Sequence, residues 1–405
     1  MAKTLFQPVK CAPETATREI PPAEQDLEIK TGNFDCAELD IAIKGLNNYK
    51  APGFDYNITA EAIKYGGDAL KERLLKLVHI IKNQLKPPSD WTKNIIVPLP
   101  KKGDLTKIKN YRGISLMSIA AKLYNKLLLN RIREKIDAKL RVNQAGYRPG
   151  RGCVEHVHTL RRIFEGCDIK NIPVVAVFVD FKKAFDSIDR NVLFKILRHY
   201  GVPEPITNAI RILYENTTSS VIVDGAITEE FEVNMGVLQG DVLAPYLFII
   251  VIDWVMMNAN IDDLGFITQK RQSRRHPEKR VGDLEYADDI ALLENTIPDA
   301  QKQLDAVSSV AKEVGLVINI EKTKVLAKGI NQPEIMLDGN TLEVVEDFQY
   351  LGAFVNGTMK DFKYRRAKAW TAFWKLKNIW NSNADINLKI KLFNASVFSV
   401  LLYAT

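Results

Sequence analysis

The chain has 405 residues, of which 46% are hydrophobic and 26% are charged, a composition that is ordinary for a globular protein. At this length we expect two or three packed units with an ample core. Four cysteines without a CxxC pair exclude a disulfide scaffold and indicate reduced thiols inside a cell, and the net charge of +7 favours polyanionic partners only mildly.

The sequence indicates neither secretion nor membrane insertion. Its first 22 residues lack the apolar core of a signal peptide, and residues 1–33, rich in Pro, Glu and Thr, are expected to form a flexible lead-in. The most apolar stretch, residues 242–257, carries Pro245 and Asp253 and is shorter than the roughly 18 to 20 apolar residues that span a membrane. We therefore expect a buried core helix there and no membrane partner.

Hydrophobic periodicity along the chain changes repeatedly between the helical and the strand pattern. Helices are predicted at residues 36–47, 60–85, 119–140, 183–200, 206–214, 298–314 and 362–379. Strands are predicted at residues 94–99, 171–181 and 316–320, with hairpins that join 221–223 to 231–233 and span 284–293. Because this alternation has no regular βαβ rhythm, it predicts an α+β fold with an antiparallel sheet.

Three acidic residues follow or interrupt strongly apolar strands. Asp180 comes directly after six apolar residues, 174–179, which predict a central strand that is buried on both faces. Asp288 and Asp289 interrupt the 284–293 hairpin at its turn. Two carboxylates about 4 Å apart repel by roughly 4 kcal/mol at an effective dielectric constant near 20, and a hard divalent cation such as Mg²⁺ removes this cost. The pattern therefore favours a two-metal site, at which one ion activates a primer 3′-hydroxyl and the other steadies a leaving pyrophosphate, over an exposed acidic turn.

The segment Tyr286-Ala287-Asp288-Asp289 resembles the catalytic box of reverse transcriptases from non-LTR (LINE-type) retrotransposons. From about residue 40 to the end of the chain, further segments resemble motifs of the same family in the same order. They are APGFD at 51–55, PLPKKGD at 98–104, NYRGISL at 110–116, NQAGYRPGRG at 143–152, GVLQGDVLAPYLF at 236–248, GLVINIEKTK at 315–324 and DFQYLG at 347–352. The chain departs from the family pattern at Tyr56, Gly113, Leu238 and Ala244, and the last two departures leave template handling open.

The resemblance implies a right-hand polymerase architecture, which is an α+β fold with fingers, an antiparallel-sheet palm and a partial helical thumb. We expect four segments along the chain. They are a flexible lead-in at 1–40, an N-terminal extension with fingers at 41–170, a palm with interleaved fingers and palm helices at 171–355, and the start of a truncated thumb at 356–405.

The same resemblance assigns roles residue by residue. It makes Asp180, Asp288 and Asp289 the catalytic metal ligands, and it makes Lys322 a catalytic general acid for the departing pyrophosphate. The aromatic ring of Phe185 would clash with a ribose 2′-hydroxyl and so select deoxynucleotides. The residues assigned to the incoming nucleotide are Lys101, Arg112, Phe181, Phe185, Gln239 and Gly240, and those assigned to primer and template are Tyr286, Tyr350, Leu351 and Gly352.

Several of these side chains also have a plain structural explanation. Phe185 fits a core aromatic at the start of a helix, and Lys322 fits an ordinary exposed lysine. Lys102 could take the place of Lys101, and either lysine could be a solvated surface residue.

Two basic stretches are less specific signals. The segment KRQSRRHPEKR at 270–280 is either a solvated loop or a surface that contacts phosphates. In the helix predicted at 362–379, lysines and arginines interleave with tryptophans; we favour packing of the tryptophans in the core over base stacking, with the cations following the nucleic-acid backbone.

The function implied by the resemblance is an RNA-directed DNA polymerase of a non-LTR retroelement, a nucleotidyltransferase that is primed by a nicked DNA target. Its cofactors would be two Mg²⁺ ions, with Mn²⁺ as a substitute. Its partners would be an RNA template, a DNA primer or target, dNTPs and an endonuclease domain of the parent polyprotein, in the nucleus or the cytoplasm. The alternatives left open are an inactive nucleic-acid-binding remnant of the same fold, a reverse transcriptase of another lineage (intron maturase or telomerase-like) and a three-acid nuclease.

Overall fold

The computed structural model describes residues 18–54, 58–101, 103–107, 110–223, 225–259 and 263–404. Contacts between residues divide the chain into two compact units, each made of three separate segments of the sequence. Unit 1 comprises Met1–Val142, Phe181–Ala259 and Val307–Ile318, and unit 2 comprises Asn143–Asp180, Asn260–Ala306 and Asn319–Thr405. The start of the predicted lead-in and the motif positions Tyr56 and Lys102 lie outside the described residues.

The helices of unit 1 form close to their predicted positions. They are α2 (Cys36–Lys44), α3 (Ala60–Tyr65), α4 (Gly67–Gln84), α5 (Ile119–Asp137), α7 (Ala184–Ser187), α8 (Arg190–His199) and α9 (Glu204–Arg211). The prediction of one helix at 183–200 is wrong, because Ile188 between α7 and α8 has an extended backbone. The Asp189 side chain then caps α8 by accepting hydrogen bonds from the backbone N–H groups of Asn191 and Val192.

The sheet of unit 1 has the strand order β2-β1-β4-β5, with β6 also paired to β4. Its strands are β1 (Lys93–Pro100), β2 (Tyr111–Leu116), β4 (Thr218–Val223), β5 (Ala226–Ile227) and β6 (Phe231–Glu232). The prediction that 221–223 pairs with 231–233 is wrong. The end of β4 pairs instead with β5, through a connection in which Gly225 has φ +82°, and β6 pairs with the start of β4 at Thr218 and Ser219.

The most apolar stretch of the chain forms α10 (Ala244–Asn258), as predicted, and nearly all of its side chains are buried. Its one acid, Asp253, is fully buried and accepts hydrogen bonds from the Tyr200 hydroxyl and from the backbone N–H of Arg141. These bonds within unit 1 satisfy a carboxylate that would otherwise be costly in an apolar helix. No helix within the described residues combines the length and the apolar character that crossing a membrane requires.

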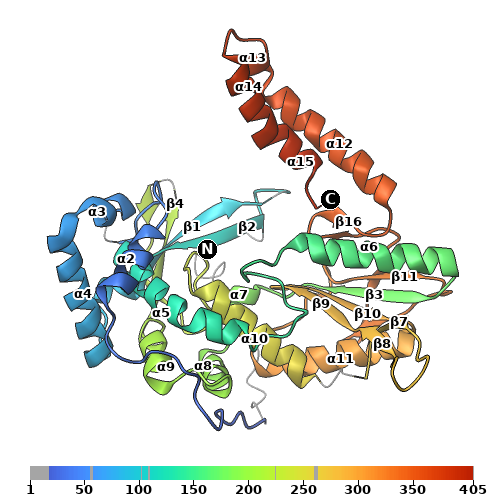
Figure 1. Cartoon of the computed structure of the whole chain (residues 1–405), viewed down its shortest axis with the longest axis horizontal. Coiled ribbons are helices and arrows are strands. Elements are labelled where there is room, and N and C mark those ends of the chain that lie inside the picture. Colours follow the sequence, from blue (N-terminus) through green and yellow to red (C-terminus); the bar gives the residue numbers. More distant parts are fainter. Residues whose placement is uncertain are drawn as a thin grey trace. The chain divides into compact units, whose positions relative to one another are not determined.

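The central feature of unit 2 is a sheet with the strand order β14-β11-β3-β10-β9; Figure 1 labels β3, β9, β10 and β11. The strands are β3 (Val174–Val179), β9 (Asp283–Tyr286), β10 (Asp289–Glu294), β11 (Lys324–Lys328) and β14 (Glu343–Val344). All neighbours are antiparallel except β11 and β14, so the predicted antiparallel sheet is confirmed with one parallel edge. β3 lies between β10 and β11, and all six of its side chains are buried, which confirms the predicted central strand.

Helix α6 (Cys153–Lys170) covers one face of this sheet, because Leu160 and Phe164 belong to the same apolar cluster as Val174, Ala176 and Phe178 of β3. Helix α11 (Ile297–Glu313) follows β10. The strand predicted at 316–320 is wrong: this segment makes a single isolated bridge, between Ile318 and Phe181 in unit 1.

Small hairpins and a helical hairpin complete unit 2. They are β7 (Phe266–Gln269) with β8 (Lys279–Val281), β12 (Met336–Leu337) with β13 (Asn340–Thr341), β15 (Gln349–Tyr350) with β16 (Ala353–Phe354), and the helices α12 (Thr358–Lys375), α13 (Lys377–Trp380), α14 (Ile386–Phe393) and α15 (Ser399–Leu401). In Figure 1 the helical hairpin, drawn in orange and red, extends away from the sheet of its own unit.

The tryptophans of α12 do not pack in the core, which corrects the prediction for that helix. Trp370 and Trp374 are 55% and 58% exposed. The buried side chains of α12 are Asp361, Arg365 and Ala369, which are spaced by four and share one face. Trp370 follows Ala369 directly, and Trp374 lies four residues after Trp370. Because each residue turns an α-helix by about 100°, both tryptophans lie to the side of the buried face.

Candidate active site

The pairing of β3 with β10 determines where the predicted catalytic acids lie. Val179, the last residue of β3, pairs with Ile290, and the two strands run antiparallel. The next position along one strand is Asp180 and the preceding position along the other is Asp289, so these acids lie at the same end of the strand pair. The sequence prediction that a lone acid after an interior strand meets an acidic pair is therefore supported by the register.

The charge on Asp289 is disfavoured by its surroundings. Removal of water by the neighbouring protein, and then the negative charges of Asp288 and Asp180, raise the pKa of Asp289 to about 6, although Lys322 acts in the opposite direction. The Asp289 residue is nevertheless exposed to solvent. An exposed carboxylate that is repelled by two others is a good ligand for a cation that approaches from solvent.

Asp180 is held by the segment that leads into β11. The Lys322 ammonium donates to both of its carboxylate oxygens, at 3.1 and 3.3 Å from Nζ. The backbone N–H of Asp180 donates to Thr323 Oγ1 at 3.3 Å, and its carbonyl oxygen accepts from the backbone N–H of Asn319 at 2.7 Å. The structure thus brings the predicted Lys322 directly to the predicted metal ligand.

The turn between β9 and β10 carries Asp288 and is supported from behind. Ala287 has φ +57°, a conformation that L-residues other than Asn and Asp seldom adopt. Its backbone N–H donates to the side-chain oxygen of buried Gln144 at 3.0 Å. Sequence reasoning missed Gln144, although the residue stands in the NQAGYRPGRG motif, because nothing in the motif itself shows which turn it contacts.

Tyr350 also supports this hairpin. It is buried, and its hydroxyl lies 2.9 Å from the carbonyl oxygen of Asp289 and 3.2 Å from that of Leu284. The predicted primer residues Leu351 and Gly352 form the turn after it, with φ +49° and +77°. Tyr286, the fourth residue assigned to primer and template, is half-buried and pairs with Asp289.

In unit 1, four of the predicted nucleotide-binding residues lie in or next to α7 and the 236–241 loop: Phe181, Phe185, Gln239 and Gly240. Phe185 is 8% exposed, and its ring stacks on Phe248 with the centroids 4.6 Å apart. Its carbonyl oxygen accepts from the backbone N–H of Val237 at 2.7 Å, which ties the loop to the helix. Phe185 therefore has the packing of a core aromatic, and its predicted contact with a sugar stays a prediction. Phe181, also buried, makes the isolated bridge to Ile318.

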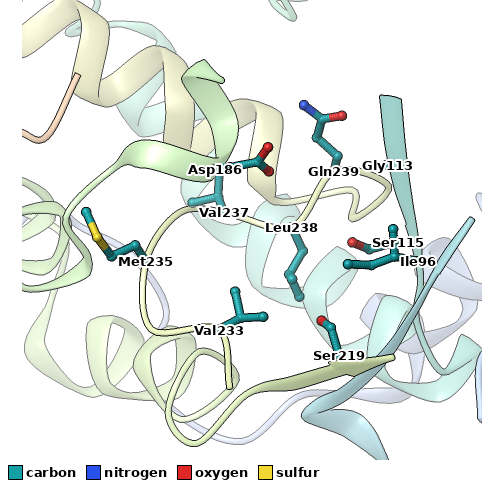
Figure 2. A pocket seen from close by; sticks show the side chains of 10 residues that line it. All are labelled: Ile96, Gly113, Ser115, Asp186, Ser219, Val233, Met235, Val237, Leu238 and Gln239. Atoms are coloured by element: carbon teal, nitrogen blue, oxygen red, sulfur yellow. The ribbon is translucent and has the colours of Figure 1, made fainter. Parts of the chain in front are cut away.

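Gly240 is required by a close approach of two backbones. It has φ +118°, and a Cβ atom added to it would lie 2.4 Å from the carbonyl oxygen of Ser115 on β2. The carbonyl oxygen of Gln239 accepts from the Ser115 backbone N–H at 2.7 Å. Figure 2 shows the narrow cavity that this contact borders, which is lined by Ile96, Gly113, Ser115, Asp186, Ser219, Val233, Met235, Val237, Leu238 and Gln239.

Asp186 is a second residue that sequence reasoning missed. It lines the cavity beside the predicted Gln239, and burial raises the pKa of Asp186 to about 6, against the opposing charges of Lys183 and Lys101. Lys101 and Arg112 lie at the same end of the antiparallel β1–β2 pair, where Leu99 is opposite Arg112 and the Lys101 N–H donates to the Asn110 carbonyl.

A comparison with known protein families matches residues 99–355, more than half of the chain, to the family described as reverse transcriptase (RNA-dependent DNA polymerase). The chain belongs to the reverse transcriptase family. The matched segment includes Asp180, Asp288, Asp289 and the predicted nucleotide-binding residues.

Proteins of retrotransposable elements are similar to this reverse transcriptase over most of its length. The "Retrovirus-related Pol polyprotein from type-1 retrotransposable element R2" of Popillia japonica is 27% identical over 382 residues, which cover 90% of this chain and 50% of that protein. The "Probable RNA-directed DNA polymerase from transposon BS" of Drosophila melanogaster is 27% identical over 395 residues, which cover 91% of this chain and 41% of that protein. The predicted resemblance to non-LTR retroelement enzymes is confirmed, and the chain spans half or less of the length of these curated relatives.

The donor set of this reverse transcriptase suits a hard divalent cation, since Asp180, Asp288 and Asp289 offer only carboxylate oxygens. Among the residues that the structure describes, no three His, Cys, Asp or Glu side chains are already gathered into a group that could hold a metal ion. Both oxygens of Asp180 face Lys322 instead.

Proposed function

We propose that this chain synthesises DNA on an RNA template by adding deoxynucleotides to a primer 3′-hydroxyl. The observation that carries the proposal is the register of unit 2, which sets Asp180 at the end of the strand pair where Asp289 begins β10, within the segment matched to the reverse transcriptase family. The relatives' names connect such chains with retrotransposable elements and RNA-directed DNA polymerase.

We propose that Asp180, Asp288 and Asp289 hold two Mg²⁺ ions, for which Mn²⁺ can substitute. When bound, such ions activate the 3′-hydroxyl and neutralise the charge on the leaving pyrophosphate. The support for this ligand set is the raised pKa of Asp289, which reflects desolvation and the proximity of the other two carboxylates. The protein contributes the fixed strand ends and the supported turn from which these side chains project.

Lys322 is proposed to keep a proton available at its Nζ atom for the departing pyrophosphate. Its side chain is 61% exposed, so an arriving substrate can reach it, while the ion pair with Asp180 keeps the ammonium at the site. This arrangement suits a general acid better than a lysine on open surface would.

The residues of unit 1 are proposed to select and hold the incoming nucleotide. Phe185 would exclude a 2′-hydroxyl with its ring, which the stacking on Phe248 holds in place. The cations Lys101 and Arg112 would meet the triphosphate, as a point charge and a bidentate donor respectively. Phe181, Gln239 and Gly240 complete the proposed set, because the glycine lets the backbone come close to a base pair.

We further propose that the unit 2 sheet is the polymerase palm, that the β1–β2 pair belongs to the fingers and that α12–α15 begin the thumb. Tyr286 and the turn at Tyr350, Leu351 and Gly352 would place the primer. The exposed Trp370 and Trp374 on α12 then become available for nucleic-acid contact, together with the exposed basic loop 270–278 between β7 and β8.

The proposed partners of the parent protein are an RNA template, a DNA target whose nicked end serves as primer, and an endonuclease domain. Target priming rests on the resemblance of the sequence motifs to those of non-LTR retrotransposon enzymes. The proposed place of action is inside the cell, in the nucleus or the cytoplasm.

Primer extension on poly-rA/oligo-dT with Mg²⁺ tests the proposal, with Asp288→Asn as the inactive control. The expected result is dTTP incorporation by the wild type and its loss in the variant, while both bind the template–primer. Equal, background incorporation by the two proteins would leave the nucleic-acid-binding remnant as the explanation. Degradation of the substrate without nucleotide addition would identify a nuclease.

A further inference from the structure

A fully buried amide side chain, that of Gln144, lies against the turn between β9 and β10. Its Oε1 accepts hydrogen bonds from the backbone N–H of Ala287 at 3.0 Å and of Gly146 at 2.8 Å, and its Nε2 donates to Glu285 Oε2 at 3.1 Å. Because two N–H donors meet the same atom, that atom must be the amide oxygen, and this fixes the orientation of the side chain.

The segment that carries Gln144 is itself fastened to β9. The backbone N–H of Ala145 donates to the Glu285 carbonyl at 2.8 Å, and the Glu285 N–H donates to the Asn143 carbonyl at 3.0 Å. Gln144 and Glu285 form an isolated parallel bridge. Residues 143–145 thus act as a short additional strand on the outer edge of β9, and the Gln144 side chain reaches from it to the turn.

The turn needs this support because of its backbone conformation. The favoured two-residue connections between antiparallel strands have a positive φ at their first residue, and Ala287 adopts φ +57° although it is not a glycine. On the other side, Gly146 approaches so closely that a Cβ atom there would lie 2.4 Å from the Ala287 nitrogen. Gln144 and Gly146 therefore both contact Ala287, the residue directly before Asp288.

We propose that Gln144 is a positioning residue that fixes the backbone of Ala287 and thereby directs the carboxylate of Asp288 toward the divalent cation. This inference rests on the proposed function, in which Asp288 is a metal ligand. Only one hydrogen bond of the Gln144 side chain, from Nε2 to Glu285, reaches a strand of the hairpin, whereas the strands have their own ladder with each other and with β3. Gln144 therefore affects the direction of the Asp288 side chain more than the stability of the sheet.

Removal of the amide by Gln144→Met tests the proposal, since methionine has a similar length but neither accepts from the turn nor donates to Glu285. Gln303→Met is the matched control. Gln303 is a fully buried glutamine of the same unit, and its Nε2 donates to the Gly282 carbonyl at 2.9 Å, outside the turn. Two readouts are compared: Mn²⁺ binding measured by electron paramagnetic resonance without substrate, and kcat and KM in primer extension.

The expected result is that Gln144→Met weakens Mn²⁺ binding and lowers kcat, each by about 10- to 100-fold, the usual effect of losing a residue that orients a metal ligand. KM for the template–primer should stay within about twofold, because the direct contacts with nucleic acid are intact. Gln303→Met should retain wild-type Mn²⁺ affinity even if its Tm falls as much as that of Gln144→Met. Equal effects of the two substitutions on Mn²⁺ affinity would overturn the proposal.

Gly146→Ala provides a second route to the same question if Gln144→Met does not fold. Its methyl group pushes on Ala287 and leaves Gln144 in place, so weaker Mn²⁺ binding by the folded variant supports the proposal and unchanged binding overturns it. Failure of the proposed function looks different: Asp288→Asn would then bind Mn²⁺ as the wild type does, and the wild type would incorporate no dTTP.

Discussion

The Lys322 ammonium lies 3.1 Å from Asp180 Oδ1 and 3.3 Å from Oδ2, so the first predicted metal ligand has a cationic partner within its own unit. Lysine and a divalent cation compete for the same carboxylate oxygens of Asp180. We therefore propose two separable effects of this lysine: it opposes metal binding at Asp180, and it supplies a proton for the leaving group.

Lys322→Met separates these effects. We expect the rate of single-turnover nucleotide addition to fall by about 100-fold or more, the contribution of a general acid, while the apparent affinity for Mg²⁺ is unchanged or tighter because the competing ammonium is gone. Rapid-quench measurements over a range of Mg²⁺ concentrations give both quantities. Lys328→Met is the matched control, since Lys328 pairs with Asp168 through Nζ–O distances of 2.6 and 2.8 Å outside the site. A normal rate combined with weaker Mg²⁺ binding in Lys322→Met would contradict the assigned role.

Metal binding should depend on pH through Asp289. Its pKa is raised to about 6 by desolvation and by the charges of Asp288 and Asp180, so the carboxylate takes up a proton as the pH falls through 6. A proton and a metal ion exclude each other at this group. We expect the Mn²⁺ dissociation constant, measured by electron paramagnetic resonance, to be nearly constant above pH 7 and to rise toward tenfold per pH unit below about 6.

Asp289→Asn is the control for this pH dependence. The variant should bind Mn²⁺ more weakly than the wild type but with a smaller change between pH 5 and 7, because the titrating carboxylate is gone. An equally steep change in the variant would assign the effect to another group.

The sequence is sufficient to predict that Asp180 and the Asp288–Asp289 pair stand at strand ends, because the signals for both strands are local. Six apolar residues before Asp180 indicate an interior strand, and two acids within a hydrophobic hairpin indicate where the turn lies. The antiparallel register that sets Asp180 beside Asp289 follows once those two strands are neighbours. The prediction of a strand at 316–320 is wrong because a local pattern does not show which strands pair. Leu316 and Ile318 are buried, as in a strand, but only Ile318 forms a β-bridge.

What could not be predicted depends on contacts between distant parts of the chain. Gln144 meets Ala287, 143 positions away, and no local pattern records that meeting. Asp186 becomes notable only because the 236–241 loop lies beside it in the fold. The exposure of Trp370 likewise follows from which face of α12 turns inward, and the buried Asp361–Arg365 pair decides that face.

Phe185→Ala tests the proposed choice between deoxynucleotides and ribonucleotides. Loss of the ring should increase the use of rUTP relative to dTTP, measured as the ratio of kcat/KM values in primer extension, by about 10-fold or more. The matched control is Phe194→Ala, because Phe194 is a similarly buried phenylalanine of the same unit, 6% exposed against 8%. Both substitutions create a cavity and destabilise the fold by about 3 to 5 kcal/mol, so stability alone predicts equal ratios. An unchanged ratio in folded Phe185→Ala would remove the steric role and leave a core aromatic.

Asp186 gives a prediction about stability that is independent of catalysis. Burial raises the pKa of Asp186 to about 6, well above the value of about 3.9 expected in the unfolded chain. The folded protein therefore binds this proton more tightly, and the group's cost to stability is absent below about pH 4, grows as the pH rises through 6 and is complete above it.

Asp186→Asn keeps the size of the side chain and removes the charge. We expect it to raise the free energy of unfolding at pH 7.5 by about 1 to 2 kcal/mol, after allowance for the partial exposure of the residue, and to lose this advantage progressively toward pH 4. Urea unfolding at several pH values measures the difference. A gain that is the same at all pH values would mean that the amide makes a new contact, whereas a loss at pH 7.5 would mean that the charge of Asp186 is stabilised by Lys183 and Lys101 more than burial disfavours it.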